Sequence, residues 1–296
     1  MIELMKDLPR PIAFALGGGG SYGAVQVGQL KALAQTDVVP DMVIGTSVGS
    51  LNATIVAQDP VSAADRLDEI WSGLSHTDVF GSVKQSIAHL AALHTPIADN
   101  ASLRSLIEQT VPLRTFEDLQ LPLSAVATSV STGTARRIDS GDLVSALMAS
   151  AAIPGVFPLV QRDGEFLMDG GLTANVPIGE AGKIGAQTIV VLDCGFSMTE
   201  IFPAHEEPLL HHLLMWTAAI ASDSQVQRDL ARFNNRTILY VPGKWPPGSS
   251  PFEFDAVHNN KTESFDIALD WLERLEVTGP GLYGKPPGVA EPANGE

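Results

Sequence analysis

Residues 16–28, LGGGGSYGAVQVG, place four consecutive glycines between a short apolar run and a segment with helical spacing. The apolar run PIAFAL, residues 11–16, predicts a buried strand that ends at the glycines. The spacing of Val25, Leu30 and Leu33 predicts that a helix follows directly. A strand, a tight glycine turn and a helix form the first part of a βαβ unit, so this stretch predicts a parallel sheet.

The same order of elements recurs further along the chain. MVIG predicts a second short strand and SLNATIVA a second helix. Further strands are predicted in residues 121–139, as a hairpin that turns at Gly133, and in residues 164–169, 188–192 and 237–240. We therefore expect an α/β fold: a doubly wound, mostly parallel sheet flanked by helices.

Helical patterns account for most of the remaining chain. Residues 61–110 predict a largely helical insertion, and residues 202–234 and 260–275 predict later helices. We expect one domain over residues 1–278. Residues 279–296 are rich in Pro and Gly and predict a flexible C-terminal tail.

The composition limits the classes of partner. The chain has 296 residues, of which 45% are hydrophobic and 18% charged, as expected of a folded globular protein. Its 34 acidic and 18 basic residues give a formal net charge of −16. Nucleic acid is excluded as a partner because phosphate contacts need clustered Lys and Arg. Long-range attraction to anionic membranes is disfavoured for the same reason, whereas transient contact of an apolar loop with a membrane surface stays open. The sequence indicates no oligomeric state.

Three features favour a cytoplasmic protein. The single cysteine, Cys194, allows no intrachain disulfide and fits a reducing compartment. The N-terminal segment has acidic residues where a signal peptide carries basic ones. Residues 208–221, PLLHHLLMWTAAIA, are too few and too polar to span a bilayer, and we expect a core helix or, alternatively, a lid over a lipid site.

Residues 44–49, IGTSVG, contain the pattern G-x-S-x-G where a predicted strand meets a predicted helix. That context is required for a nucleophile elbow, in which a tight turn strains the serine backbone and projects its hydroxyl. Gly45 and Gly49 keep side chains out of the crossing of strand and helix. Ser47 is therefore the candidate nucleophile.

The glycines after the first strand predict the second part of such a site. Attack on an ester carbonyl creates an oxyanion, which needs preorganised hydrogen-bond donors. The N–H groups of Gly18, Gly19 and Gly20 are unobstructed by side chains and can form such an anion-binding nest. Since parallel strands end at one edge of a sheet, this turn and the Ser47 turn are expected to lie together.

The same glycines allow a competing interpretation. Gly18, Gly20 and Gly23 spell G-x-G-x-x-G, the fingerprint of a dinucleotide site. Such a site also needs an Asp or Glu at the end of the second strand. Here Asp41 precedes that strand, which runs into Gly45 instead. The dinucleotide interpretation is therefore disfavoured.

A serine hydroxyl needs a neighbouring base, and Asp169 is the first candidate. It follows the predicted strand of residues 165–168, and Gly170 and Gly171 leave room for close approach. An aspartate becomes a useful base when desolvation raises its pKa, and the apolar residues 166–168 are consistent with this. An ordinary turn aspartate is the alternative.

A Ser-His-Asp triad is the competing mechanism. His258 lies after the strand at residues 237–240, where such a histidine is expected, and Asp193 follows an earlier strand. The order of residues leaves both the Ser47–Asp169 pair and the Ser47–Asp193–His258 triad open.

Four motifs together resemble the patatin-like phospholipase family. They are GGGGSYG at residues 17–23, GTSVG at 45–49, ASAAIPGVFP at 149–158 and DGG at 169–171. Their order, strand contexts and spacing agree with the family, and the resemblance covers roughly residues 10–242.

The resemblance implies a patatin-like fold and hydrolysis of lipid acyl esters through an acyl-enzyme. It implies Ser47 as nucleophile, Asp169 as base and the Gly18, Gly19 and Gly20 turn as oxyanion hole. It implies no catalytic histidine, no metal and no cofactor.

The sequence departs from the family at Tyr22, where an Arg or Lys is usual. The change removes a positive charge beside the glycine turn, which bears on the binding of anionic headgroups. Together with the acidic composition, it motivates a further alternative: a catalytically silent lipid-binding module on the same fold.

Overall fold

The glycine turn lies between a buried strand and a helix, as predicted. β1 (Ile12–Leu16) leads through the 3-10 helix η1 (Gly20–Tyr22) into α1 (Gly23–Leu33). β2 (Met42–Thr46) leads directly into α2 (Val48–Gln58). β1 and β2 pair in parallel, so both turns lie at the same edge of the sheet.

The computed structural model describes residues 8–81, 98, 100–194, 210–244 and 251–286, with only the backbone for 210–216. Within these residues the sheet has nine strands in the order β5-β6-β3-β2-β1-β7-β8-β9, with β4 also paired to β3. The further strands are β3 (Leu123–Ser129), β4 (Ala135–Ile138), β5 (Val160–Arg162), β6 (Glu165–Asp169), β7 (Thr188–Leu192), β8 (Thr237–Tyr240) and β9 (Gly281–Tyr283). β4 and β6 run antiparallel to β3, whereas the path from β3 to β9 is parallel throughout. The mostly parallel α/β sheet predicted from the sequence is confirmed.

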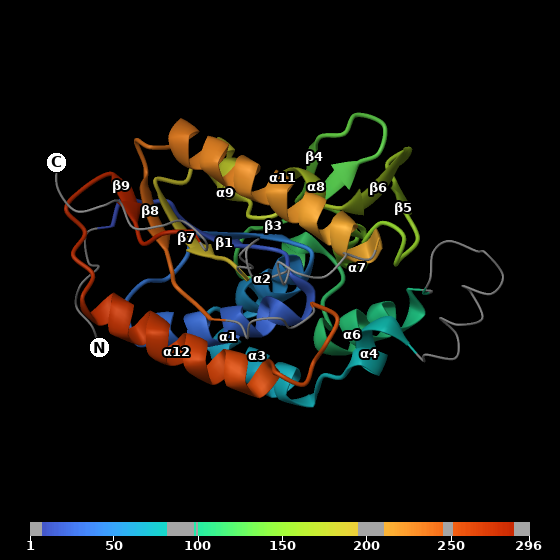
Figure 1. Cartoon of the computed structure of the whole chain (residues 1–296), viewed down its shortest axis with the longest axis horizontal. Coiled ribbons are helices and arrows are strands. Elements are labelled where there is room, and N and C mark those ends of the chain that lie inside the picture. The colour runs from blue at the N-terminus through green and yellow to red at the C-terminus, as the bar shows by residue number, and fades with distance from the viewer. Residues whose placement is uncertain (1–7, 82–97, 99, 195–209, 245–250, 287–296) are drawn as a thin grey trace.

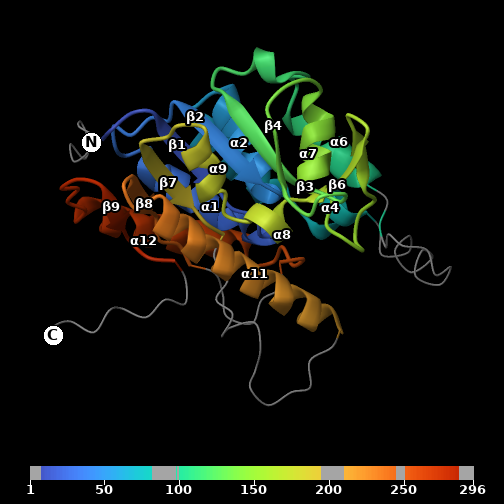
Figure 2. The ribbon, with the colours of Figure 1, turned by 90° about the horizontal axis from the view of Figure 1, so that it is seen from above.

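Helices cover both faces of this sheet (Figure 1). The remaining helices of the described residues are α3 (Ala63–Gly73), α4 (His76–Phe80), α6 (Ala101–Thr110), the 3-10 helix η2 (Phe116–Asp118), α7 (Leu143–Ser150), α8 (Gly171–Ala174), α9 (Ile178–Lys183), α11 (Leu210–Arg232) and α12 (Val257–Glu273). Figure 1 shows α8, α9 and α11 on one side of the sheet and α1, α3 and α12 on the other, and Figure 2 shows α11 next to α8.

The strands alternate between two hydrophobic cores. In β1, Phe14 and Leu16 face the core under α1 and α12, whereas Ala13 and Ala15 face the core under α9 and α11. Successive side chains of a strand point to opposite faces, so a sheet that is covered on both sides needs continuously apolar strands. The unbroken apolar runs of the sequence follow from this arrangement.

The predicted helices are found wherever the structure describes them. α3, α4 and α6 occupy the insertion predicted for residues 61–110, of which 82–97 and 99 lie outside the described residues. α11 occupies most of residues 202–234, but 202–209 and the side chains of 210–216 are not described. The core-helix and lid interpretations of residues 208–221 therefore stay predictions. Within the described residues, none of the helices combines the length and apolar character needed to cross a bilayer.

The segment predicted as a flexible tail begins with a strand. Residues 281–283 form β9, which pairs in parallel with β8, and Gly281 N–H donates to Arg236 O at 2.9 Å. The Tyr283 hydroxyl accepts from Thr278 N–H at 3.0 Å and folds the approach to this strand. The sequence did not predict this strand, because three residues among Pro and Gly are too few to show a periodic pattern. Residues 287–296 lie outside the described residues.

Candidate active site

Ser47 has the strained backbone that the G-x-S-x-G pattern predicts. Its φ of 54° and ψ of −128° lie in a region that residues other than glycine rarely adopt. The surrounding structure holds this conformation, since Ser47 N–H donates to Ser150 Oγ at 2.9 Å. Ser47 is only 7% exposed and lines a cavity, so it is shielded from open solvent.

Two glycines make the Ser47 turn possible by close backbone approach. A Cβ atom at Gly45 would lie 2.2 Å from Gly49 O, and one at Gly49 would lie 2.3 Å from Leu16 O. Real Cβ atoms do not come this close to a carbonyl oxygen. The ends of β1 and β2 and the start of α2 therefore pack backbone against backbone, which explains both glycines of the motif.

Ser150 also belongs to the site, although it is not among the residues predicted from the sequence. Its hydroxyl donates to Val126 O at 2.6 Å while accepting the Ser47 N–H, and its carbonyl accepts Gly170 N–H at 3.4 Å. The last turn of α7 thus connects the serine turn to the turn after β6. The available sequence signal was the motif at residues 149–158, which contains Ser150.

Asp169, the last residue of β6, is buried beside Ser47. Burial raises the pKa of Asp169 to about 6, although hydrogen bonds from the Ser47 side chain and the Gly171 N–H favour its charged form. Gly171 N–H donates to Oδ1 at 2.7 Å. Oδ2 has no hydrogen bond of ordinary geometry to any described group, so the contact with Ser47 is looser than the one with Gly171. Apolar burial and an unpaired carboxylate oxygen make Asp169 more basic than a free aspartate.

The glycine loop lies against the serine turn. A Cβ at Gly18 would lie 3.1 Å from Ser47 Cβ. Gly18 N–H is already engaged, because it donates to Asn175 O at 3.0 Å. Among the described groups, no acceptor is paired with the N–H of Gly19 or Gly20, and Gly20 lines the same cavity as Ser47. Two of the three predicted donors therefore have no acceptor among the described groups, and Gly18 lies close to Ser47.

The other motif glycines are also packing positions. A Cβ at Gly170 would lie 2.3 Å from Val126 O, which lets the turn after β6 pack on β3. A Cβ at Gly23 would lie 2.7 Å from the Trp71 ring. These two glycines bring neighbouring elements close to the site.

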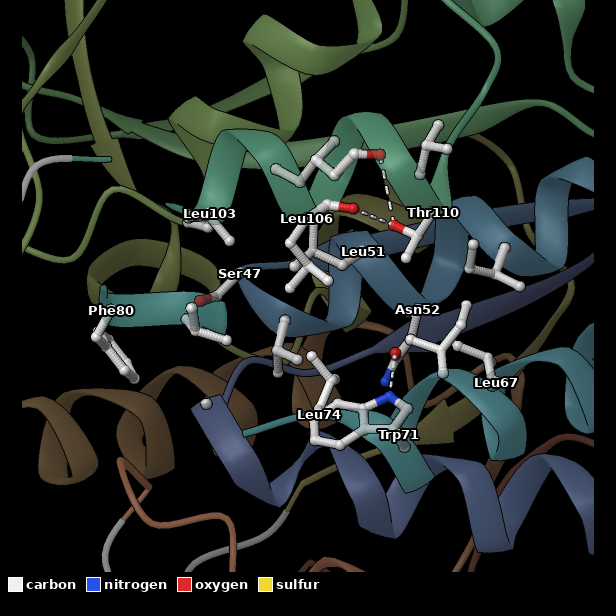
Figure 3. A pocket seen from close by; sticks show the side chains of 18 of the residues that line it. Ser47, Leu51, Asn52, Leu67, Trp71, Leu74, Phe80, Leu103, Leu106 and Thr110 are labelled. Atoms are coloured by element: carbon white, nitrogen blue, oxygen red, sulfur yellow. Dashed lines mark hydrogen bonds between the residues drawn. The ribbon is translucent and has the colours of Figure 1, made fainter. Parts of the chain in front are cut away.

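An apolar cavity of about 90 Å³ lies beside Ser47. Many of its lining residues lie on α2, α3, α4 and α6, and the helical insertion supplies about half of the lining. Figure 3 shows Ser47 and Phe80 toward one end of the lining and Leu67 and Thr110 toward the other. Thr110 donates internally to Leu106 O at 2.8 Å, which leaves the wall apolar in character. Such a cavity suits a hydrocarbon group attached to the atom that Ser47 reaches.

The residues of the alternative triad are not joined to Ser47. Tyr240 donates to Asp193 Oδ2 at 2.5 Å, and a Cβ at Gly17 would lie 3.1 Å from Asp193 Oδ1. His258 is exposed at the start of α12. Within the described residues, neither Asp193 nor His258 makes a hydrogen bond to Ser47.

Asp41, the acid nearest to the position that a dinucleotide site requires, has a structural role at the edge of the sheet where β1 and β2 begin. Asp41 accepts Ile12 N–H at 2.6 Å and pairs with Arg10, where β1 begins. The described residues contain no group of three or more His, Cys, Asp or Glu side chains arranged to hold a metal ion.

Tyr22, which replaces the family's usual Arg or Lys, is 4% exposed. Its N–H donates to Gly19 O at 3.1 Å, within η1. The position is therefore buried beneath the glycine loop.

Comparison with known proteins gives a consistent family assignment. The sequence model described as Patatin-like phospholipase matches residues 14–181, which include all four motifs. Human patatin-like phospholipase domain-containing protein 6 is 30% identical over 207 residues, which cover 69% of this chain and 15% of the relative. Neuropathy target esterase sws of Drosophila melanogaster is 28% identical over 190 residues, covering 62% of this chain and 13% of the relative.

The chain spans about one-seventh of the length of these curated relatives. Among solved structures, VipD from Legionella pneumophila aligns with 90% of this chain and 67% of VipD, at 15% identity and a TM-score of 0.45. The family match covers more than half of the chain and contains the serine turn, the glycine loop and the aspartate turn. The chain belongs to the patatin-like phospholipase family.

Proposed function

We propose that this protein hydrolyses acyl esters of lipids through a Ser47–Asp169 dyad. The observation that carries the proposal is a strained, buried serine next to a buried carboxylate whose pKa is raised to about 6. Ser47 is the nucleophile and Asp169 the general base. The N–H groups of Gly19 and Gly20 bind the oxyanion, and Gly18 brings their loop against Ser47.

The first half of the reaction forms an acyl-enzyme. As Ser47 Oγ attacks the ester carbonyl, its proton passes to the unpaired Oδ2 of Asp169. The carbonyl oxygen becomes negatively charged and is stabilised by the free N–H groups of the glycine loop, a term commonly worth about 3 kcal/mol per donor. The C–O bond to the alcohol then breaks, and Asp169 returns the proton to the leaving oxygen.

The second half regenerates the enzyme. A water molecule attacks the acyl carbon while Asp169 takes its proton, and the bond to Ser47 Oγ breaks as that oxygen is protonated. The products are a carboxylic acid and the free serine. A base with a pKa of about 6 is mostly ionised at neutral pH, yet binds a proton more tightly than an ordinary aspartate.

The cavity beside Ser47 suggests what is bound. Its apolar walls suit the acyl chain of the ester. The relatives are named as phospholipase-domain proteins and as an esterase, which supports a lipid ester as substrate. Buried Tyr22 supplies no cation at the position where the family usually has one, so we infer that the acyl chain contributes more to recognition than an anionic headgroup does.

The same proposal places the reaction in the cytoplasm, with access to a membrane surface. The single, buried Cys194 fits a reducing, cytoplasmic compartment. Transient contact with a membrane surface would deliver the ester to the cavity.

A fluorophosphonate probe tests the proposal directly, since only a serine competent for acylation reacts with it. We expect labelling of Ser47, abolished in Ser47→Ala, together with hydrolysis in a panel from short esters to phospholipids and lysophospholipids. Folded protein without labelling at Ser47 would instead support a silent lipid-binding module. Activity confined to short soluble esters would restrict the function to that of an esterase.

A further inference from the structure

A chain of buried hydrogen bonds connects the cavity wall to the glycine loop. Its central member is Gln26 of α1, which has no exposed surface. Gln26 Nε2 donates to Gly17 O at 2.8 Å and to Leu192 O at 2.9 Å. Its Oε1 accepts from Asn52 Nδ2 at 2.8 Å. The amide of Gln26 is therefore satisfied on both sides.

The chain continues from Asn52 to the cavity. Asn52 Nδ2 also donates to Gly23 O at 3.1 Å, and Asn52 Oδ1 accepts from Trp71 Nε1 at 3.0 Å. Figure 3 shows the bond between Trp71 and Asn52 in the cavity lining. Asn52 and Trp71 are 2% and 4% exposed, so water does not compete for these bonds.

The indole group and the backbone carbonyls, which can only donate and only accept, respectively, together set the direction of the chain. A Trp N–H can only donate, so the oxygen of the Asn52 amide must face Trp71 and its nitrogen must face Gln26. The oxygen of the Gln26 amide must then face Asn52, which directs both N–H groups of Gln26 to backbone carbonyls. The backbone carbonyls that accept from the two amides impose the same orientation, so the amides are held by an obligate donor at one end of the chain and by obligate acceptors at the other.

The bond from Gln26 fixes a peptide plane at the start of the glycine loop. Because a peptide is planar, the direction of Gly17 C=O also sets the direction of Gly18 N–H. Gly18 N–H donates to Asn175 O at 3.0 Å, so this plane is held at both ends. Glycines have wide conformational freedom, and the loop needs such an external anchor to keep one geometry.

We propose that Gln26 is a positioning residue of the glycine loop and that Asn52 and Trp71 hold its amide in the required orientation. The inference rests on the proposed function, in which the next two N–H groups of the loop, those of Gly19 and Gly20, bind the oxyanion. Gln26 contacts no substrate; it acts through Gly17.

The same helix offers a matched control. Gln29 lies one turn after Gln26 in α1 and is 1% exposed. Its Nε2 donates to Val241 O at 2.9 Å and to Asp193 O at 3.4 Å, and no bond joins it to residues 17–20 in the described structure. Gln29→Met thus removes buried hydrogen bonds of the same kind without changing the loop's anchor.

Hydrogen exchange measured by mass spectrometry tests the anchoring independently of activity. We expect Gln26→Met to increase exchange of the Gly17 and Gly18 amides, the two loop amides that have acceptors among the described groups, by about tenfold or more, corresponding to the loss of about one hydrogen bond. Trp71→Phe keeps the ring bulk and is expected to give a smaller increase, whereas Gln29→Met leaves these amides as in the wild type. Equal exchange of these amides in Gln26→Met and in the wild type, or an equal increase in the Gln29→Met control, overturns the proposal.

Kinetics on a short, soluble p-nitrophenyl ester test the consequence for the reaction. We expect Gln26→Met to lower kcat by about 10- to 100-fold, somewhat less than the removal of an oxyanion donor, with KM changed less than about threefold. The pH midpoint should stay at its wild-type value because Asp169 is untouched. Increased exchange with unchanged kcat would mean that Gln26 anchors the loop without serving the reaction, and would also overturn the proposal. A wild type without Ser47-dependent hydrolysis refutes the proposed function, and the exchange experiment then still decides the anchoring.

Discussion

Two aspartates lie at strand ends near the glycine loop, and their surroundings give them different properties. Asp193 follows β7 and accepts a hydrogen bond from Tyr240. Burial raises the pKa of Asp223, and the charge of Asp193 raises it further. Asp169 ends β6 and, within the described part of the chain, has one backbone donor on Oδ1 and no ordinary hydrogen bond on Oδ2. A carboxylate held by a phenol serves as a structural acceptor. A buried carboxylate with one oxygen unpaired and a serine beside it can act as a base.

The largest expected difference between the two acids is in catalysis. Asp169→Asn should lower Ser47-dependent ester hydrolysis by about 10²- to 10⁴-fold, the range typical of a lost general base. Asp193→Asn, in which the amide oxygen can still accept from Tyr240, should change the rate less than about threefold, since no reacting group is lost. Steady-state kinetics on one soluble ester compare the two variants. An equally large loss in Asp193→Asn would point back to the triad mechanism.

The pH dependence of the rate sharpens the comparison. Because Asp169 must be ionised to accept the serine proton, and its pKa is about 6, kcat/KM should rise with pH with a midpoint at about 6 and reach its plateau at about pH 7. At pH 5 the rate should be about tenfold below the plateau, as for one titrating base. Asp193→Asn should keep this profile. A midpoint near 4 would show that Asp169 is not desolvated as described or is not the base.

The ionised form of Asp169, which the reaction requires, should make the folded protein less stable. The pKa of Asp169 is raised from 3.8 to about 6 in the folded protein, so the folded state binds the proton more tightly than the unfolded state. The resulting stabilisation is complete below pH 3.8 and is lost as pH rises through about 6. The loss corresponds to about 3 kcal/mol.

Asp169→Asn should therefore be more stable than the wild type at pH 8, by up to about 3 kcal/mol, with the gain disappearing near pH 4. Urea unfolding at both pH values measures this difference. Asp193→Asn should show no comparable gain, because Tyr240 already donates to that carboxylate. A destabilised Asp169→Asn at pH 8 would contradict the assignment of burial as the dominant effect.

The smallest expected effect is at His258. The side chain is exposed on α12 and makes no bond to Ser47 in the described structure, so His258→Ala should keep hydrolysis within about twofold of the wild type. The same ester assay serves as the measurement. A loss of more than about tenfold would indicate that His258 takes part in the reaction, given the usual contribution of such a base.

The local sequence pattern predicted those residues of the site that lie within a single turn of the chain. Gly45 and Gly49 carry a signal because only glycine allows such close backbone approach, and Ser47 lies between them. Asp169 was recognisable from its apolar strand and following glycines. The three-residue strand β9 was missed because its pairing partner, not its own composition, makes it a strand.

Side-chain bridges between distant segments had no such signal. Ser150 lies 103 positions from Ser47, and Gln26 lies 166 positions from Leu192. A serine or glutamine inside a helical pattern looks the same in sequence whether it bridges two turns or faces solvent. Only the packed structure shows that Ser150 holds the Ser47 turn.

The sequence by itself determined the alternation of the main strands, glycine turns and helices and the placement of Ser47 and Asp169 at strand ends, because periodicity and glycine requirements are local properties of the chain. Only the tertiary structure decided which acid lies beside the serine, how far its pKa rises, and which N–H groups of the glycine loop have no acceptor among the described residues. These depend on burial and on hydrogen-bond partners from remote segments, which exist only once the sheet and its two helical layers have packed.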